Sequence, residues 1–73
     1  MIEKCHIRVG HKIKILRECF GMTQEDLAIA VGIGRTSIAN IETGRQRLLL
    51  HSIAKFAKAL GVEPEMLLKN IWK

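Results

Sequence analysis

A short stretch in the middle of the chain, residues 35 to 43, carries hydrogen-bonding side chains around two isoleucines. Its polar positions include Arg35, Thr36 and Asn40. Arginine can bond O6 and N7 of guanine together, asparagine can bond N6 and N7 of adenine, and threonine offers thymine a hydroxyl and a methyl group. Because Thr36 and Asn40 are four residues apart, a helix would place them on one face. The pattern predicts a short helix that presents these groups to base edges in the major groove.

Residue types that occur in active sites and metal sites are present, but their spacing is unsuitable. The thiol and imidazole residues are Cys5, His6, His11, Cys19 and His51. They form none of the C-x-x-C or H-x-x-x-H patterns that are typical of zinc sites. No nucleophile with a base and an orienting group is indicated, and no pair of catalytic carboxylates. We therefore expect a protein that is not an enzyme and that needs no metal, cofactor or small-molecule ligand.

The length and charge of the chain favour a single basic domain covering residues 1–73. Twelve Lys and Arg residues oppose seven Asp and Glu residues, which gives a net charge of +5. Such a balance favours polyanionic partners, with a solvated positive surface as the alternative. No secretion signal or apolar run of roughly 18 residues is evident, so we expect a cytoplasmic protein with reduced thiols and no membrane contact. A chain this short has a small core, and a partner chain would add stability.

Glycine-punctuated apolar stripes with a helical period indicate five short helices. The apolar positions are Val9, Ile13, Leu16 and Phe20, then Leu27, Ala28 and Val31, then Ile38 and Ile41, then Ile53, Phe56, Ala57 and Leu60, and finally Met66, Leu67 and Ile71. Thr23 and Asp26 are placed to cap the second helix, and Pro64 suits the first turn of the last one. No stretch alternates with the period of a strand. The expected fold class is all-α, a compact five-helix bundle.

The second and third expected helices are separated only by Gly32, Ile33 and Gly34. Because Gly32 can adopt positive φ, so short a link sets the helices at a steep angle. We expect Ala28 to lie where the two helices cross and Ile33 to plug the turn.

The segment "MTQEDLAIAVGIGRTSIANIETGR" resembles the helix-turn-helix of the Cro/repressor-type (XRE-like) family, and the similarity runs without gaps from about Val9 to Leu68. Its diagnostic parts are "TQEDLA", the "VGI" turn, "I-x-x-I-E-x-G" and "AKALGV". The resemblance implies a lambda repressor-like DNA-binding domain that usually acts as a dimer on a two-fold operator.

The resemblance also implies roles for individual residues. The base-reading residues are expected to be Arg35, Thr36 and Asn40. The expected contacts to the DNA backbone are Thr23, Gln24, Ser37, Arg45 and Arg47. Arg17 and Glu42 match a pair that often forms an internal salt bridge in related domains, with an exposed Glu42 as the alternative.

Two segments depart from the family pattern. Gly34 stands where a Ser or Thr N-cap is usual, although Gly is tolerated there. "RLLLHS" at residues 47–52 replaces a polar entry to the fourth helix and holds more leucines than one buried position needs. We therefore expect some of these leucines to be exposed and available to a partner.

These features together predict a sequence-specific transcription regulator that binds double-stranded DNA as a homodimer. Phage Cro-like repressors and controllers of restriction-modification genes are both of this type. The dimer interface is expected at Leu67, Ile71 and Trp72, unless Trp72 folds back on its own domain. The alternative function is an antitoxin-like interaction module that binds a partner protein and regulates its own operon. Neither the operator sequence nor the choice between activation and repression follows from the sequence.

Overall fold

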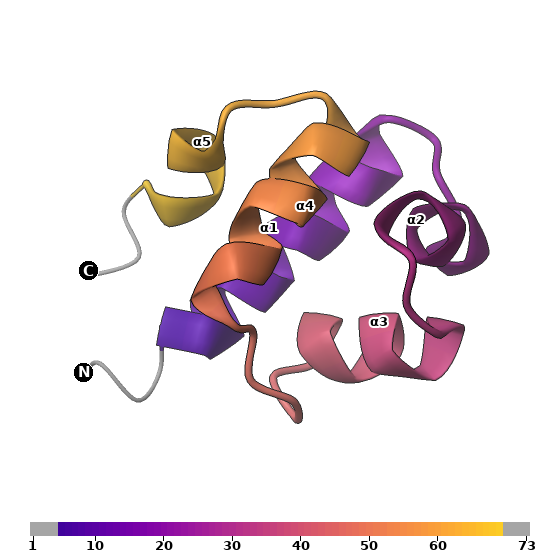
Figure 1. Cartoon of the computed structure of the whole chain (residues 1–73), viewed down its shortest axis with the longest axis horizontal. Coiled ribbons are helices and arrows are strands. Elements are labelled where there is room, and N and C mark those ends of the chain that lie inside the picture. Colours follow the sequence, from indigo (N-terminus) through magenta and orange to yellow (C-terminus); the bar gives the residue numbers. More distant parts are fainter. Residues whose placement is uncertain (1–4, 70–73) are drawn as a thin grey trace.

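Five helices follow one another along residues 5–69, the part of the chain that this computed structural model describes (Figure 1). They are α1 (Cys5–Cys19), α2 (Gln24–Val31), α3 (Arg35–Glu42), α4 (Leu50–Leu60) and α5 (Pro64–Leu68). No strand occurs within these residues, so the prediction of an all-α fold of five helices is confirmed. None of the described helices is long and apolar enough to cross a membrane.

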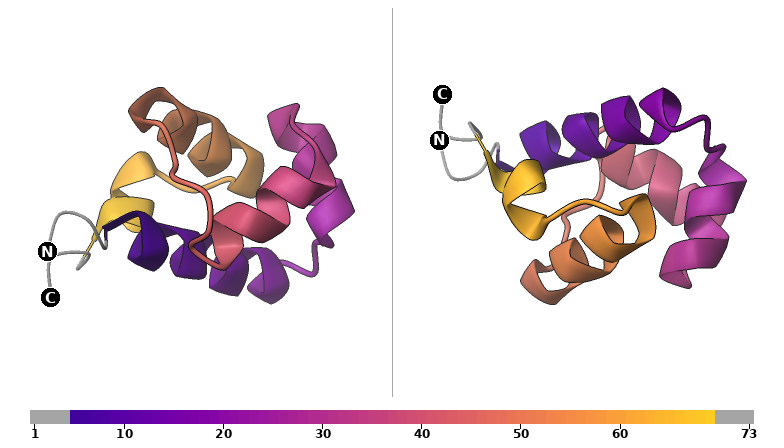
Figure 2. Two further views of the ribbon diagram at one scale, coloured as in Figure 1. Left: turned by 90° about the horizontal axis from the view of Figure 1, so that it is seen from below. Right: turned by 90° about the horizontal axis from the view of Figure 1, so that it is seen from above.

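The core lies between α1 and α4, which run on opposite sides of the molecule, with α2 and α5 at opposite ends (Figure 2). Every helix contributes to it. The buried apolar residues are Val9, Ile13, Leu27, Ala28, Ile38, Ile41, Ile53, Phe56, Ala57, Leu60 and Leu67. The helical period of the sequence predicted these positions, because a helix that packs on one side buries residues three and four apart. The carbonyl of Lys69, near the end of the described chain, accepts a hydrogen bond from Nζ of Lys12. This bond ties α1 to the segment after α5.

The predicted capping box begins α2. Oγ1 of Thr23 accepts a hydrogen bond from the Asp26 N–H at 3.0 Å, and the Thr23 N–H donates to Oδ2 of Asp26 at 2.9 Å. Each side chain satisfies a backbone group that the first turn of a helix leaves unpaired. The bond from the Thr23 backbone, reinforced by the Thr23 side chain, lowers the pKa of Asp26.

Three apolar residues do not lie where the sequence predicted. Phe20 is 52% exposed, because α1 ends at Cys19 and the helical stripe ends with it. Met66, expected on the apolar stripe of the last helix, is 46% exposed, whereas Leu67, expected on the same stripe and also at the dimer interface, is fully buried. The assignment of Leu67 to a dimer interface is therefore wrong, since its side chain has no exposed area to offer a second copy. Ile71 and Trp72, assigned to the same interface, lie outside the described residues.

Candidate nucleic-acid interface

The link between α2 and α3 is a tight turn with Gly32 at its start. Gly32 lies in the left-handed region with φ at 88°, and its N–H donates to the carbonyl of Ala28 over 2.8 Å. A residue with a Cβ atom would be strained in this conformation. In Figure 1, α2 is seen nearly end-on while α3 lies along the page, so the turn sets the two helices at a steep angle as predicted.

The apolar residues of α3 face inwards and leave its first turn open to solvent. Ile38 and Ile41 are buried, whereas Arg35 and Thr36 are exposed and Asn40 is half-buried. Gly34 takes the N-cap position in extended backbone and supplies no side-chain cap. The three residues predicted to read bases thus lie on one helix, and the two in its first turn are exposed.

A buried ion pair ties α3 to α1. Nε of Arg17 donates to Oε2 of Glu42 at 2.7 Å, and Nη2 donates to Oε1 at 3.1 Å. The two side chains are 8% and 1% exposed. The hydrogen bond to Glu42 raises the pKa of Arg17, although burial acts in the opposite direction. The structure thus contains the pair that the resemblance implied, and Glu42 is not an exposed acid.

Gln24 links this buried pair to Arg35, which is exposed. Its Nε2 donates to Oε1 of Glu42 at 3.1 Å, and its Oε1 accepts a hydrogen bond from Nη1 of Arg35 at 3.2 Å. Gln24 is predicted from the family resemblance to contact the DNA backbone, and no pattern in the sequence relates it to Arg35. Because Gln24 opens α2 and Arg35 opens α3, only the turn between the helices brings them together.

The close contact of α1 with α3 depends on Gly10, a residue that was not among those predicted to matter for the site. A Cβ atom at this position would lie 1.9 Å from the carbonyl oxygen of Ile41, far inside any real contact. Gly10, Ile13 and Arg17 share one face of α1, being three and seven residues apart. A glycine inside a predicted helix, in line with a core residue, was the signal available in the sequence.

The residues predicted to contact the DNA backbone surround this region without forming one cluster. Arg45 and Arg47 are exposed in the segment after α3, where the Arg45 N–H donates to the carbonyl of Asn40 at 2.8 Å. This bond folds the basic segment against the end of α3. Thr23 is exposed at the start of α2, although its hydroxyl already serves the capping box.

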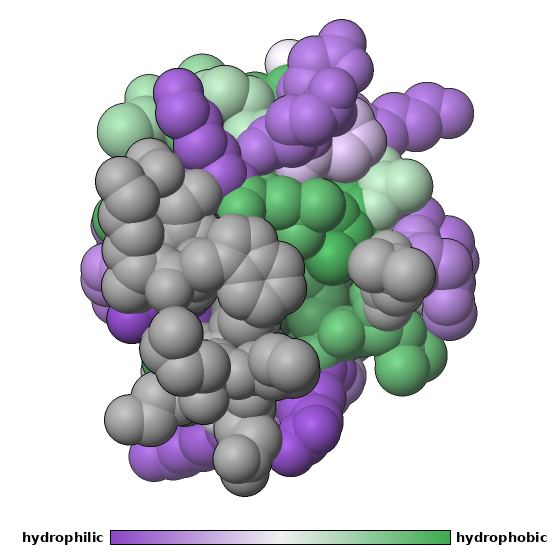
Figure 3. Space-filling model, turned by 90° about the vertical axis from the view of Figure 1, so that its left-hand side faces the viewer, coloured by the Kyte–Doolittle hydropathy of each residue, from purple (hydrophilic) through white to green (hydrophobic). Residues whose placement is uncertain are grey.

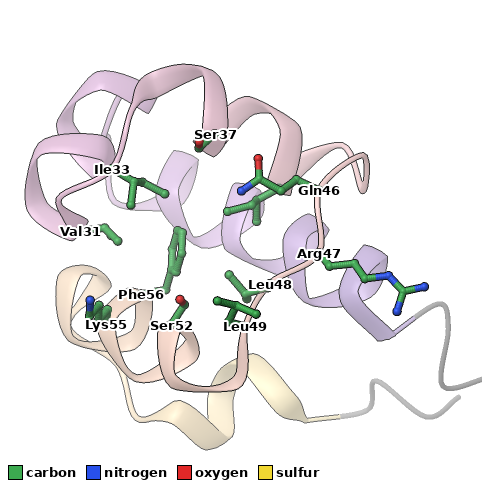
Figure 4. A pocket seen from close by; sticks show the side chains of 11 residues that line it. Val31, Ile33, Ser37, Gln46, Arg47, Leu48, Leu49, Ser52, Lys55 and Phe56 are labelled. Carbon is green, nitrogen blue, oxygen red and sulfur yellow. The ribbon is translucent and has the colours of Figure 1, made fainter.

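Ser37 lies instead on the wall of a pocket of about 190 Å³. The pocket opens between the turn after α2, the segment after α3 and the first turns of α4 (Figure 4). Ile33, predicted to plug the turn, also lines this pocket and stays exposed. Figure 4 shows the ring of Phe56 in the pocket and the guanidinium of Arg47 pointing away from it. Ser37 is therefore half-buried, as is Gln24. The other residues of the predicted backbone set, Thr23, Arg45 and Arg47, are exposed.

Within residues 5–69, no group of three His, Cys, Asp or Glu side chains is arranged to hold a metal ion. Cys19 carries a free, exposed thiol. The arrangement offers hydrogen-bond donors and positive charge on an accessible helix, which suits recognition of a polyanion.

Comparison with known proteins identifies the family. A model of helix-turn-helix proteins matches residues 13–67. The chain belongs to the helix-turn-helix family. In helix-turn-helix terms, α2 and α3 are the two helices of the motif and α3 is the recognition helix.

Among relatives of this helix-turn-helix chain is the control protein C.BamHI of Bacillus amyloliquefaciens, 38% identical over 69 residues that cover 93% of this chain and 85% of the relative. Among solved structures, the restriction-modification controller C.AhdI from Aeromonas hydrophila superposes with a TM-score of 0.81 at 34% identity, covering 85% of this chain and 94% of that one. The controller C.Esp1396I, solved as a tetramer with its natural 35 base-pair operator, gives a TM-score of 0.80 at 38% identity over 94% of this chain and 96% of that one.

Proposed function

We propose that this protein is a transcription regulator of the restriction-modification controller type, which binds a specific site in duplex DNA through α3. The observation that carries the proposal is the placement of α3. Buried Ile38 and Ile41 and the Arg17–Glu42 pair fix this helix on the core, while Arg35 and Thr36 stay exposed in its first turn. A helix held in this way can enter a major groove with its N-terminal residues against base edges. The controllers among its relatives support this function over the antitoxin-like alternative.

In this proposal, the polar residues divide between base edges and phosphates. Arg35 suits a guanine, Thr36 a thymine methyl group and Asn40 an adenine. Arg45, whose backbone folds against the end of α3, and Arg47, which follows in the same segment, supply positive charge to the phosphates on one side, and Thr23 and Gln24 lie at the start of α2. Phosphate contacts carry no sequence information directly, so these residues set affinity and salt dependence.

The working unit in the cytoplasm would be a homodimer. One recognition helix reads only a few base pairs, and a two-fold dimer doubles the reading. Both ends of the described chain lie on one side of the molecule in Figure 1, and Figure 3 shows hydrophobic residues in the middle of that face. Met66 supplies exposed apolar surface near the end of the described chain. Met66 takes the place of Leu67 in the proposed interface, with Ile71 and Trp72 following it in the sequence.

Selection of bound DNA from a random pool tests the proposal. We expect one enriched site with two-fold symmetry and half-sites about 10 base pairs apart. Arg35→Ala and Asn40→Ala should each weaken binding to that site by about 1–3 kcal/mol and relax the preference at one base pair. Lys58→Ala is the control, because it removes a positive charge from α4 and should leave base preference unchanged.

Arg45→Ala and Arg47→Ala should weaken binding to all DNA equally and flatten the salt dependence by about one charge each. A pool from which no sequence is enriched, or an Arg35→Ala variant with the parent's preferences, would refute the assignment of α3 as the reading helix. Sedimentation at micromolar concentration tests the dimer separately, and a monomer at every concentration would remove it.

A further inference from the structure

We propose that the pocket between α3 and α4 binds a small molecule that has an apolar body and one carboxylate group. No motif in the sequence predicted a small-molecule ligand, because the residues that line the pocket come from the turn after α2, from α3 and its following segment, and from α4. The pocket is formed by the protein alone and does not require DNA.

The apolar walls and the size of the pocket define the body of the ligand. Ile41 and Phe56 are 3% and 1% exposed, and Figure 4 shows the ring of Phe56 in the pocket. Ile33 and Leu49, which also line it, are 37% and 63% exposed, so apolar surface faces water in the free protein. The pocket has a volume of about 190 Å³, and a cavity of about 150 Å³ can hold a benzene ring. A ring with one short polar arm therefore fits, and it would remove apolar surface from water.

The polar groups of the pocket suit an anion. The described residues that line it include two cations, Arg47 and Lys55, and no Asp or Glu. The guanidinium of Arg47 points away from the pocket, so Lys55, with its flexible stem, is the cation left for a ligand (Figure 4). The hydroxyl groups of Ser37 and Ser52 form no hydrogen bond with another described residue, and each can donate to a carboxylate. Charge complementarity thus selects an acid over an amine of the same shape.

A bound acid should oppose DNA binding. This consequence rests on the proposed function, in which Ser37 and Arg47 contact DNA phosphates. Because Ser37 lines the pocket and Arg47 borders it, a carboxylate there would bring a negative charge close to these phosphates. DNA must then weaken the binding of the acid by the same factor by which the acid weakens the binding of DNA.

Titration of the free full-length protein with phenylacetate, followed by nuclear magnetic resonance, tests the site. The amide signals of Ser37, Ser52 and Phe56 should shift and saturate with a dissociation constant of about 1–10 mM, as expected for about ten non-hydrogen atoms. Nuclear Overhauser contacts should join the ring protons of phenylacetate to the methyl groups of Val31 and Leu48. We expect 2-phenylethanol to bind at least about threefold more weakly, 2-phenylethylamine more weakly still, and inorganic phosphate not to saturate the Phe56 signal.

A matched pair of variants tests the role of the cation. Lys55→Gln should remove the preference for phenylacetate over 2-phenylethanol. Lys58→Gln should keep this preference, because Lys58 is also an exposed lysine of α4 but does not line the pocket. Equal affinities of the parent for the acid, the alcohol and the amine would overturn the proposed site, as would the absence of saturable shifts. Pocket signals that shift with protein concentration and then ignore phenylacetate would show that a second copy of the chain fills the pocket, which would also overturn it.

The effect on DNA is measured on the site selected from the random pool. Saturating phenylacetate should raise the dissociation constant for this site by about two- to fivefold more than the same concentration of acetate, which carries the charge without the apolar body. Equal effects of phenylacetate and acetate would refute the opposition to DNA. Failure of the random pool to yield a site would refute only the proposed function, because the titration of the free protein needs no DNA.

Discussion

The contact between α1 and α3 and the apolar face of α4 hold the same small core by different means. The α1–α3 contact consists of Gly10 against the backbone of Ile41 and the buried pair of Arg17 with Glu42. The α4 face consists of four buried apolar residues, Ile53, Phe56, Ala57 and Leu60. One contact is polar and close, and the other is apolar and follows the helical period.

This difference bears on what each contact can fix. Apolar burial is non-directional and roughly proportional to area, so it holds a helix on the core without specifying its position closely. A bidentate pair has a narrow geometry, because both nitrogen–oxygen distances must be satisfied together. The directional contact occurs at α3, the helix that in the proposed function presents Arg35 and Asn40 to base edges.

Removal of Glu42 should give the largest effect and is the strictest test of this comparison. Glu42→Ala leaves Arg17 charged and buried without its partner, which we expect to reduce the free energy of unfolding by about 3–5 kcal/mol. Urea unfolding followed by circular dichroism measures the loss. The control is Glu18→Ala, because Glu18 is 3.9 Å from Arg17 but 58% exposed, and its loss should cost less than about 1 kcal/mol. Similar values for the two variants would contradict a buried, directional contact.

Gly10→Ala should give the second-largest loss in the free energy of unfolding. The added Cβ atom would meet a backbone carbonyl, which cannot move aside as a flexible side chain can, so α1 and α3 must separate. We expect a loss of about 1–3 kcal/mol, the usual range for overpacking. The gain in helix propensity from Gly to Ala, about 1 kcal/mol, offsets part of it. A variant as stable as the parent would show that α1 and α3 tolerate a wider spacing, and the comparison would then rest on the ion pair alone.

The apolar face of α4 could be predicted from the sequence, and the polar contact between α1 and α3 only in part. The spacing of Ile53, Phe56, Ala57 and Leu60 is a property of one helix, so it shows directly in the chain. The close approach at Gly10 and the bonds of Gln24 to Glu42 and Arg35 join residues from different helices, and no local pattern encodes them. The pairing of Arg17 with Glu42 came from the family resemblance. The sequence did not show which of Met66 and Leu67 is buried, because α5 is only five residues long, too short to establish a helical period.

Thr23→Ala should have a smaller effect, because the capping box lies at the surface and touches neither contact. The first turn of α2 would lose the side-chain acceptor for the Asp26 N–H, at a cost of about 1 kcal/mol. Thermal unfolding measures this loss. Thr43→Ala is the matched control, since its hydroxyl bonds to the Ala39 carbonyl within α3 and replaces no missing backbone partner. Equal losses for the two variants would show that the cap adds nothing specific to the start of α2.

The smallest expected effect is the dependence of stability on acid pH, and it separates the surface cap from the buried pair. The hydrogen bond from the Thr23 backbone lowers the pKa of Asp26, so the native state favours the ionised carboxylate more than the unfolded state does. Its contribution to stability is therefore present above the pKa of an unfolded aspartate, near 4, and is lost as pH falls through the lower native value. Melting temperatures of the parent and of Asp26→Asn should differ by a constant amount above about pH 5 and converge as the pH falls through the lowered native pKa of Asp26. Arg17, whose pKa is raised by its bond to Glu42, stays charged throughout this range. A difference that persists unchanged to the lowest pH would show that the cap acts through shape and hydrogen bonding rather than through the charge of Asp26.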